Sequence, residues 1–207
     1  MYLLSTILII ANVLSLIGNS LFCLSSLFKR KRQIILFQTA NHFLSTIAQF
    51  LQSAYSGMIQ DSLSLVKNLV LLFVNENKKI LRFTINVIVI ILCLVIGVII
   101  NITLSGNVWY GYLPIISNVV YGIVVLYVFM KGFKKDTEEL IIKSALIFNS
   151  LCWGTYGIFV KLYPITIFNG ITLIISIISI IIILVQKSRN RANNRENEDE
   201  NQEEVQQ

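Results

Sequence analysis

A single lysine stands inside an otherwise apolar stretch, "QDSLSLVKNLVLLF", at residues 60–73. In a helix, Lys67 shares one side with the polar residues Gln60, Ser64 and Asn68. A buried ammonium must be paired, hydrated or deprotonated, and it attracts the negative part of a bound molecule. The pattern therefore predicts contact with a solute or coupling to a proton, with a purely structural lysine as the alternative.

Residues 35–54 carry a second polar face, which includes the only histidine of the chain. A spacing of threes and fours places these side chains on one side of a helix: Gln38, Asn41, His42, Ser45, Gln49 and Gln52. Histidine changes its charge near neutral pH, so His42 is a candidate for a proton relay. A hydrogen bond from its ring to a neighbouring carbonyl is the structural alternative.

Catalytic and metal-binding signatures are missing from the sequence. It holds no GxSxG or HExxH motif and no phosphate-cradling glycine loop. Cys23, Cys93 and Cys152 lie in separate apolar segments without CxxC spacing, which argues against a disulfide framework or a zinc site. We therefore expect no enzyme activity, no cofactor and no metal.

The elements that position these side chains are apolar helices. Hydrophobic residues make up 55% of the 207 residues and charged residues 14%, with a mean hydropathy of +0.73, which excludes an ordinary soluble domain. A membrane-spanning helix needs about 20 apolar residues. The pattern predicts an all-α, polytopic membrane protein with seven transmembrane helices. We expect them at residues 3–27, 35–54, 58–75, 83–102, 109–130, 139–160 and 164–185.

Basic residues gather in alternate connections between these segments. They occur in "KRKRQ", "NENKK" and "KGFKKD", and again in "QKSRNR" after the last helix, whereas Lys161 is the only basic residue of the other three connections. Cytoplasmic loops of membrane proteins retain positive charge. The N-terminus is therefore expected outside the cell and the C-terminus inside it.

The order of spans and loops occurs twice, and an offset of 104 residues superimposes the two copies. Residues 1–78 form the first three-helix repeat, 79–106 a linker helix, and 107–186 the second repeat. Residues 187–207 are expected to be a disordered, charged cytoplasmic tail, because they offer almost nothing apolar to bury. The offset pairs polar positions of the two halves: Ser45 with Asn149, Gln49 with Trp153, and Gln52 with Tyr156. We expect Gln49 and Trp153 to approach each other across a pseudo-two-fold axis.

This 3+1+3 plan of parallel repeats resembles the SWEET and PQ-loop superfamily of membrane transporters. More narrowly, the chain is similar to the YgjV-type family of bacterial inner-membrane proteins. The resemblance is carried by "LQSAYSGMIQDSLSLVKNLV", with Lys67 and Asn68 at its basic and Asn positions, and by "LCWGTYGIF" in the second half. One departure concerns proline, because Pro114 is the only one beyond the first residue of a predicted span, so proline hinges for a SWEET-like motion are mostly missing.

The resemblance implies a solute pocket between the repeats, near the membrane centre. Its asparagines match Asn68 and Asn169, and its tryptophan matches Trp153, with Gln49 as the partner position. Together with the residues found from spacing and offset, the candidate substrate-binding set is Gln49, His42, Lys67, Asn68, Asn149, Trp153, Tyr156 and Asn169.

We predict a transporter of a small polar or anionic solute in the cell's inner membrane. The alternative is a non-transporting scaffold or accessory subunit whose polar faces only join helices. No acidic residue lies at the depth of Lys67 in another span, so its companions are expected to be neutral groups, water or the solute. The expected partners are the lipid bilayer and the solute, with no nucleic acid, and assembly as a homo-oligomer stays open.

Overall fold

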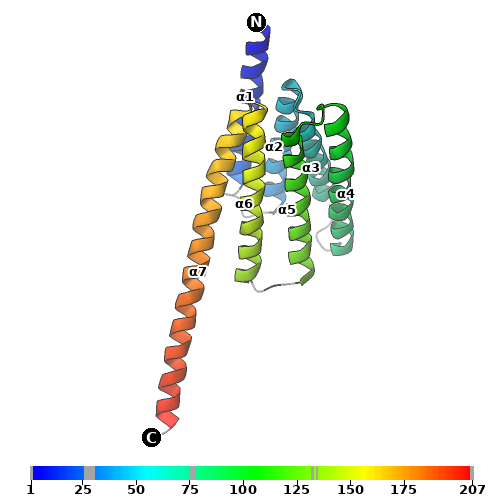
Figure 1. Ribbon diagram of the computed structural model, residues 1–207. Coiled ribbons are helices and arrows are strands. Elements are labelled where there is room, and N and C mark those ends of the chain that lie inside the picture. The colour runs from blue at the N-terminus through cyan, green and yellow to red at the C-terminus, as the bar shows by residue number, and fades with distance from the viewer. Residues whose placement is uncertain (1, 26–30, 75–77, 132, 134, 206–207) are drawn as a thin grey trace.

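The computed structural model describes residues 2–25, 31–74, 78–131, 133 and 135–205, and these form seven α-helices and one short 3₁₀ turn (Figure 1). The α-helices are α1 (Tyr2–Ser25), α2 (Lys31–Leu51), α3 (Tyr55–Phe73), α4 (Lys79–Thr103), α5 (Tyr112–Lys131), α6 (Lys135–Phe159) and α7 (Tyr163–Val205). The 3₁₀ turn η1 (Trp109–Gly111) leads into α5. The all-α prediction with seven helices is confirmed.

The chain turns between the predicted spans 83–102 and 109–130, within "TLSGNVWYG" at residues 103–111. Helix α4 ends at Thr103, and the chain then turns through Gly106 and Asn107, whose φ angles are +72° and +56°. Such positive angles are natural for glycine and tolerated by asparagine. Pro114 lies in the first turn of α5, where a missing backbone N–H costs little.

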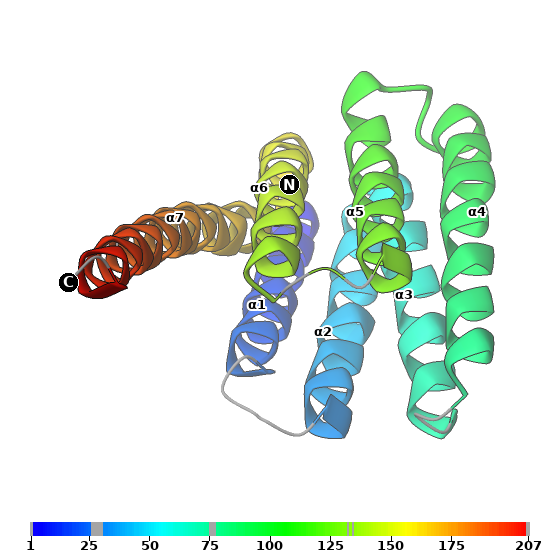
Figure 2. The same ribbon diagram turned by 90° about the horizontal axis from the view of Figure 1, so that it is seen from below.

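Six of the helices form a closed ring. Each packs on the next in the order α1, α2, α3, α5, α6, α7, and α7 returns to α1. Helix α4 packs against α3 and α5 and contributes nothing to the lining of the central cavity described below. Figures 1 and 2 show α4 at one edge of the molecule and α7 at the opposite edge. In this ring, α2 lies between α1 and α3, and α6 lies between α5 and α7.

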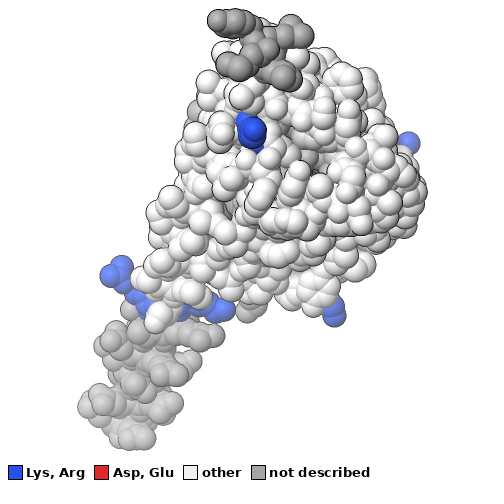
Figure 3. Space-filling model, turned by 45° about the horizontal axis from the view of Figure 1, so that its top comes forward, with Lys and Arg blue, Asp and Glu red and all other residues white. Residues whose placement is uncertain are grey.

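The molecule is apolar outside and polar inside. Ile9, Phe73 and Ile167 are 63%, 86% and 59% exposed, whereas Gln49 and Gln60 are completely buried. Figure 3 shows a face on which the described residues are almost all uncharged. A surface of this kind suits a lipid environment, in which interior polar groups must be satisfied by one another.

Four helices, α1, α4, α5 and α7, contain segments long and apolar enough to cross a membrane: Ser5–Leu24, Lys79–Thr103, Trp109–Val128 and Tyr163–Arg189. The other three, α2, α3 and α6, are less apolar because they carry most of the polar lining of the interior. Length and composition alone therefore identify fewer spans than the seven expected from sequence.

Helix α7 is longer than expected. The sequence predicted a disordered tail from residue 187, but the backbone continues as helix to Val205 and extends well below the other helices in Figure 1. The tail contains Glu, Gln and Arg, which have favourable helix propensity, although it also contains as many Asn as Glu residues. It also follows an existing helix, so no new nucleation is needed.

Candidate functional site

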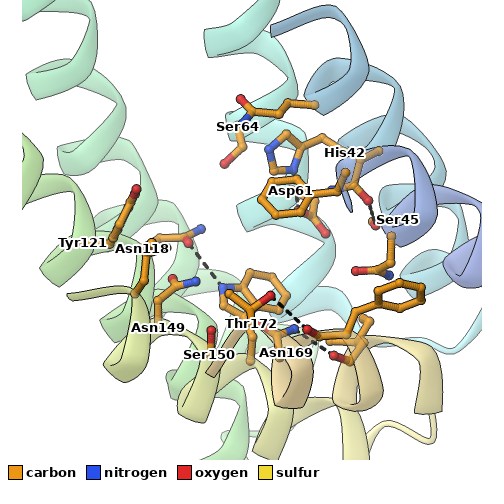
Figure 4. A pocket seen from close by; sticks show the side chains of 18 of the residues that line it. His42, Ser45, Asp61, Ser64, Asn118, Tyr121, Asn149, Ser150, Asn169 and Thr172 are labelled. Atoms are coloured by element: carbon orange, nitrogen blue, oxygen red, sulfur yellow. Dashed lines mark hydrogen bonds and ion pairs between the residues drawn. The ribbon is translucent and has the colours of Figure 1, made fainter. Parts of the chain in front are cut away.

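The ring of helices encloses a cavity of about 280 Å³. Every helix of the ring contributes to its lining, and α2, α3, α6 and α7 do so at intervals of three and four residues, as one helix face requires. Figure 4 shows His42, Asp61 and Ser64 on one side of the cavity and Asn118, Tyr121 and Asn149 on the other. The lining is Asn19, Phe22, Cys23, Gln38, Asn41, His42, Ser45, Asp61, Ser64, Lys67, Asn68, Asn118, Tyr121, Leu146, Asn149, Ser150, Trp153, Ile165, Phe168, Asn169 and Thr172.

A histidine in contact with a carboxylate forms one wall of the cavity. His42 Nδ1 lies 2.8 Å from Asp61 Oδ1, and the two side chains are 20% and 9% exposed. The other carboxylate oxygen, Asp61 Oδ2, accepts a hydrogen bond of 2.6 Å from Gln49 Nε2. Both oxygens of this buried carboxylate are therefore engaged, as burial of an ionisable group requires.

Lys67 and Asn68 lie on α3 one to two turns beyond Asp61. Within the described part of the chain, Lys67 forms no ion pair. Asn68 is 5% exposed, and its Nδ2 is buried without a hydrogen-bond partner among the described residues. The lining thus includes a lysine that forms no direct ion pair and a neighbouring amide nitrogen that forms no hydrogen bond among the described residues.

Amide and indole groups join the opposite wall to α3. Trp153 Nε1 points to Asn118 Oδ1 at 3.4 Å, and Asn118 Nδ2 donates to Gln60 Oε1 at 3.2 Å. Gln60 Nε2 in turn donates to the carbonyl of Cys93 on α4 at 2.9 Å. This chain of bonds fixes the Trp153 ring in the cavity wall.

A tyrosine closes the cavity toward the end of the molecule where α3, α5 and α7 begin. The Tyr156 hydroxyl donates to the carbonyl of Ala54 at 3.0 Å and accepts the backbone N–H of Gly57 at 2.9 Å. Beyond it lies a second cavity of about 360 Å³, lined by residues of the connections at that end and by Tyr156 itself. Tyr156 therefore lines the second cavity and packs against Trp153, which lines the first.

Six of the predicted site residues line the first cavity: His42, Lys67, Asn68, Asn149, Trp153 and Asn169. Gln49 lies behind the wall, bonded to Asp61, and Tyr156 lines the second cavity. Trp153 packs edge-on against Tyr156 at a ring-centroid distance of 5.8 Å. The side chains of Tyr156 and Gln49 both occupy the space in which a β-carbon of Gly57 would lie, so Tyr156 lies close to Gln49 as well as to Trp153.

Sequence reasoning missed Asp61. Acidic residues near Lys67 were considered only in the other predicted spans. Asp61 lies in the same span as Lys67, close to its start. The structure buries Asp61 in the same cavity as Lys67. A helical spacing of three between Asp61, Ser64 and Lys67 was the signal that could have placed the acid on this face.

An apolar exterior around a closed ring of helices, with ionisable groups inside, defines a polytopic helical membrane protein with a polar central cavity. The family model described as Imp-YgjV, bacterial inner membrane protein, matches residues 9–187. The chain therefore belongs to this family, and it is a multi-pass protein of the inner membrane. No curated protein and no solved structure matches it.

Proposed function

We propose that the protein carries a small polar or anionic solute across the inner membrane through the central cavity. The observation that carries this proposal is the lining, in which Lys67 has no ion-pair partner among the described residues and Asn68 Nδ2 has no hydrogen-bond partner there. Both groups would be satisfied by a negative or hydrogen-bond-accepting solute. A cavity of about 280 Å³ is close to the lower end for small-molecule sites, about 300 Å³, so the solute is small.

The 3+1+3 repeat supports this function. Under the 104-residue offset, lining positions of α2 and α3 correspond to lining positions of α6 and α7: His42 with Leu146, Ser45 with Asn149, Asp61 with Ile165, Ser64 with Phe168, and Asn68 with Thr172. The contact of α3 with α5 likewise corresponds to that of α7 with α1. Two related halves around one central site are the usual plan of secondary transporters.

All seven helices span the membrane in this proposal, with the basic connections in the cytoplasm. Helices α2, α3 and α6 need no wholly apolar surface, because their polar faces line the cavity. The first cavity then lies toward the cytoplasmic half, since it includes Phe22 and Cys23 near the end of α1. The structure would represent an inward-facing state closed on the outside by Tyr156.

A scaffold without transport is the competing function, and it requires close packing where this molecule has a cavity. Many polar side chains do bind helices together, as Asn101 shows by accepting from Ser56 and donating to the Val108 carbonyl. Lys67 and Asn68 Nδ2 differ because no such partner is found for them among the described residues. The proposal includes no enzyme activity, cofactor or nucleic-acid partner.

Transport can be tested by uptake into proteoliposomes of labelled lactate, glutamate, inorganic phosphate and glucose. Lys67→Met should abolish uptake of the transported probe while leaving folding nearly intact, because it removes a desolvation cost. Lys67→Arg should retain partial activity, since it keeps the charge on a wider, planar group. Lys79→Met, at an exposed lysine where α4 begins, is the matched control and should transport normally.

Two results would contradict the solute-facing role of Lys67. One is normal transport by Lys67→Met, and the other is loss of assembly of that variant in the membrane. Failure of the wild-type protein to take up any member of a wider panel of charged and polar probes would favour the scaffold.

A further inference from the structure

The His42–Asp61 pair consists of two ionisable side chains at a helix contact that neutral side chains could also form. One carboxylate oxygen of Asp61 contacts His42 of α2, and the other accepts a hydrogen bond from Gln49 of α2. The Gln49 amide would therefore be enough to join α2 to α3. Carboxylate and imidazole groups inside membrane proteins are costly, and they mark ion or proton pathways. We propose that His42 and Asp61 form the proton-binding site that couples solute movement to the proton gradient. This inference rests on the proposed transport function and deepens it by naming the coupling ion.

The comparison of the two halves weakens a packing role for these groups. The 104-residue offset places Leu146, Ile165 and Ile171 at the positions that correspond to His42, Asp61 and Lys67. Leu146 and Ile165 line the same cavity as their counterparts. At the positions of His42 and Asp61, the second half therefore lines the cavity with aliphatic side chains. The ionisable groups are confined to the first half, where they add charge that the helix arrangement does not need.

Proton binding changes the net charge of this wall. With the His42 Nδ1 proton donated to the Asp61 carboxylate and Nε2 unprotonated, the pair carries one negative charge. A second proton on Nε2 gives an imidazolium beside a carboxylate, and the pair becomes neutral. Histidine is the side chain whose charge normally changes between about pH 5 and 8. The gained proton stays on His42 Nε2 and is released from there.

Lys67 links this proton to the solute. It lies six residues from Asp61 on α3, a rise of about 9 Å, and it lines the same cavity. Without the added proton, the charge of Lys67 is balanced by the negative pair; with it, the cavity wall carries one net positive charge. Binding of the proton therefore favours binding of an anion, and linkage requires the anion to favour the proton by the same factor. The proposed protein is therefore a symporter, in which a proton and an anion bind together and cross the membrane in the same direction.

Other titratable groups near the pair come from the neighbouring helices. Cys23 of α1 and Tyr121 of α5 line the cavity, and Tyr156 of α6 lies beside Gln49. Helix α7 contributes neutral groups, among them Asn169 and Thr172. Neither a thiol nor a phenol ordinarily changes its charge between about pH 5 and 8, so none of these groups replaces the His42–Asp61 pair as the proposed proton-binding site.

The proton site can be tested without knowing the solute. The full chain in nanodiscs, labelled with ¹⁵N-histidine, gives one imidazole signal set, because His42 is the only histidine. We expect the ring signals to titrate between about pH 5 and 8 in the wild-type protein. In Asp61→Asn, the midpoint should differ by at least about a tenfold change in proton concentration, within the usual range of site coupling. Glu138→Gln, which makes the same change at an exposed acid of α6, is the control and should match the wild type.

Unchanged His42 signals throughout this pH range, or the same midpoint in Asp61→Asn as in the wild type, would overturn the proton site. The melting temperature in nanodiscs checks the fold of each variant. If Asp61→Asn does not fold, Asp61→Glu takes its place, and its displaced carboxylate must also alter the titration.

Coupling is then measured in proteoliposomes that contain a pH-sensitive dye, with the same four labelled probes. An inward acid gradient should drive accumulation of the transported anion together with protons. His42→Gln should lose at least about tenfold of the gradient-driven accumulation, whereas the control Glu138→Gln should keep it. Uptake that does not depend on the pH gradient would agree with the transport function and would contradict proton coupling. Absence of any uptake would remove the transport function and the coupling role together, whatever the His42 spectra show.

Discussion

Two buried asparagines show how differently the same side chain is used in this molecule. Asn101 is completely buried, and its amide oxygen and nitrogen are both bonded, to Ser56 and to the carbonyl of Val108. Asn68 is almost as buried, yet its Nδ2 has no partner among the described residues. Burial without a partner costs free energy, so a native group in this state suggests a partner supplied from outside the chain.

A pair of matched substitutions separates these roles. Asn68→Leu should leave the melting temperature equal or slightly higher, because an unsatisfied amide is removed, and it should lower the affinity for the transported probe. Asn101→Leu should lower the free energy of unfolding by about 1–3 kcal/mol, since it leaves the partners of the amide without their bonds. Thermal unfolding in detergent and probe binding to the same samples provide the two measurements. A larger loss of stability in Asn68→Leu than in Asn101→Leu would contradict the assignment.

At the scale of the elements, close approach of α2, α3 and α6 closes one end of the cavity. The closure depends on Gly57, because a β-carbon there would lie against the Gln49 side chain and 2.6 Å from Cε1 of Tyr156. Both neighbours are buried and hydrogen-bonded, so they have little freedom to move away. The absence of a side chain at Gly57 allows the Tyr156 hydroxyl to reach the backbone of α3.

Gly57→Ala should therefore destabilise the protein although alanine is the better helix former. Overpacking costs about 1–3 kcal/mol, which exceeds the gain of up to about 1 kcal/mol in helix propensity. Gly170→Ala is the matched control, because nothing lies within 4 Å of a β-carbon built there, and it should be neutral or stabilising. Equal melting temperatures for the two variants would contradict this prediction, because they would show that the structure around residue 57 accommodates a methyl group without loss of stability.

At the scale of the whole molecule, the two ends of the helix ring differ in charge. The connections α1–α2, α3–α4 and α5–α6 contain or adjoin the basic clusters, and the basic segment "QKSRNR" lies in α7 beyond the ring. The helix ends that flank these connections lie toward the lower end of the molecule in Figure 1, and the other three connections lie toward the upper end. This separation is what the positive-inside rule requires of a protein with its lower end in the cytoplasm.

Reporter fusions test this orientation. Fusions near Lys31, Lys79 and Lys134, and in the C-terminal tail, should report the cytoplasm, whereas fusions at Ser56 and Gly106 should report the outside. An external C-terminus would contradict the seven-span proposal and the parallel repeat that depends on it. Because the fusions are read by compartment alone, the result does not depend on whether the protein transports a solute.

The sequence by itself determined the helices, most of their ends, and the faces that turn inward. Hydropathy and turn chemistry were sufficient because a segment of chain must satisfy its own backbone in lipid, whatever its neighbours do. The break before Trp109 and the polar face that includes His42 and Gln49 are local properties, and they were predicted correctly. The length of α7 was not, because charged residues that cannot build a core can still extend a helix.

Only the tertiary structure decided which polar groups meet. His42 and Asp61 are 19 residues apart and Gln49 and Asp61 are 12 apart, and each pair joins two different helices. Helical spacing places a side chain on a face but does not give the depth and rotation of the neighbouring helix. For that reason Tyr156, which shares a face with Trp153 and Asn149, lies in the second cavity instead of the first. The Asp61 carboxylate meets the only histidine because α2 packs against α3, and residue spacing within either helix could not have predicted this pair.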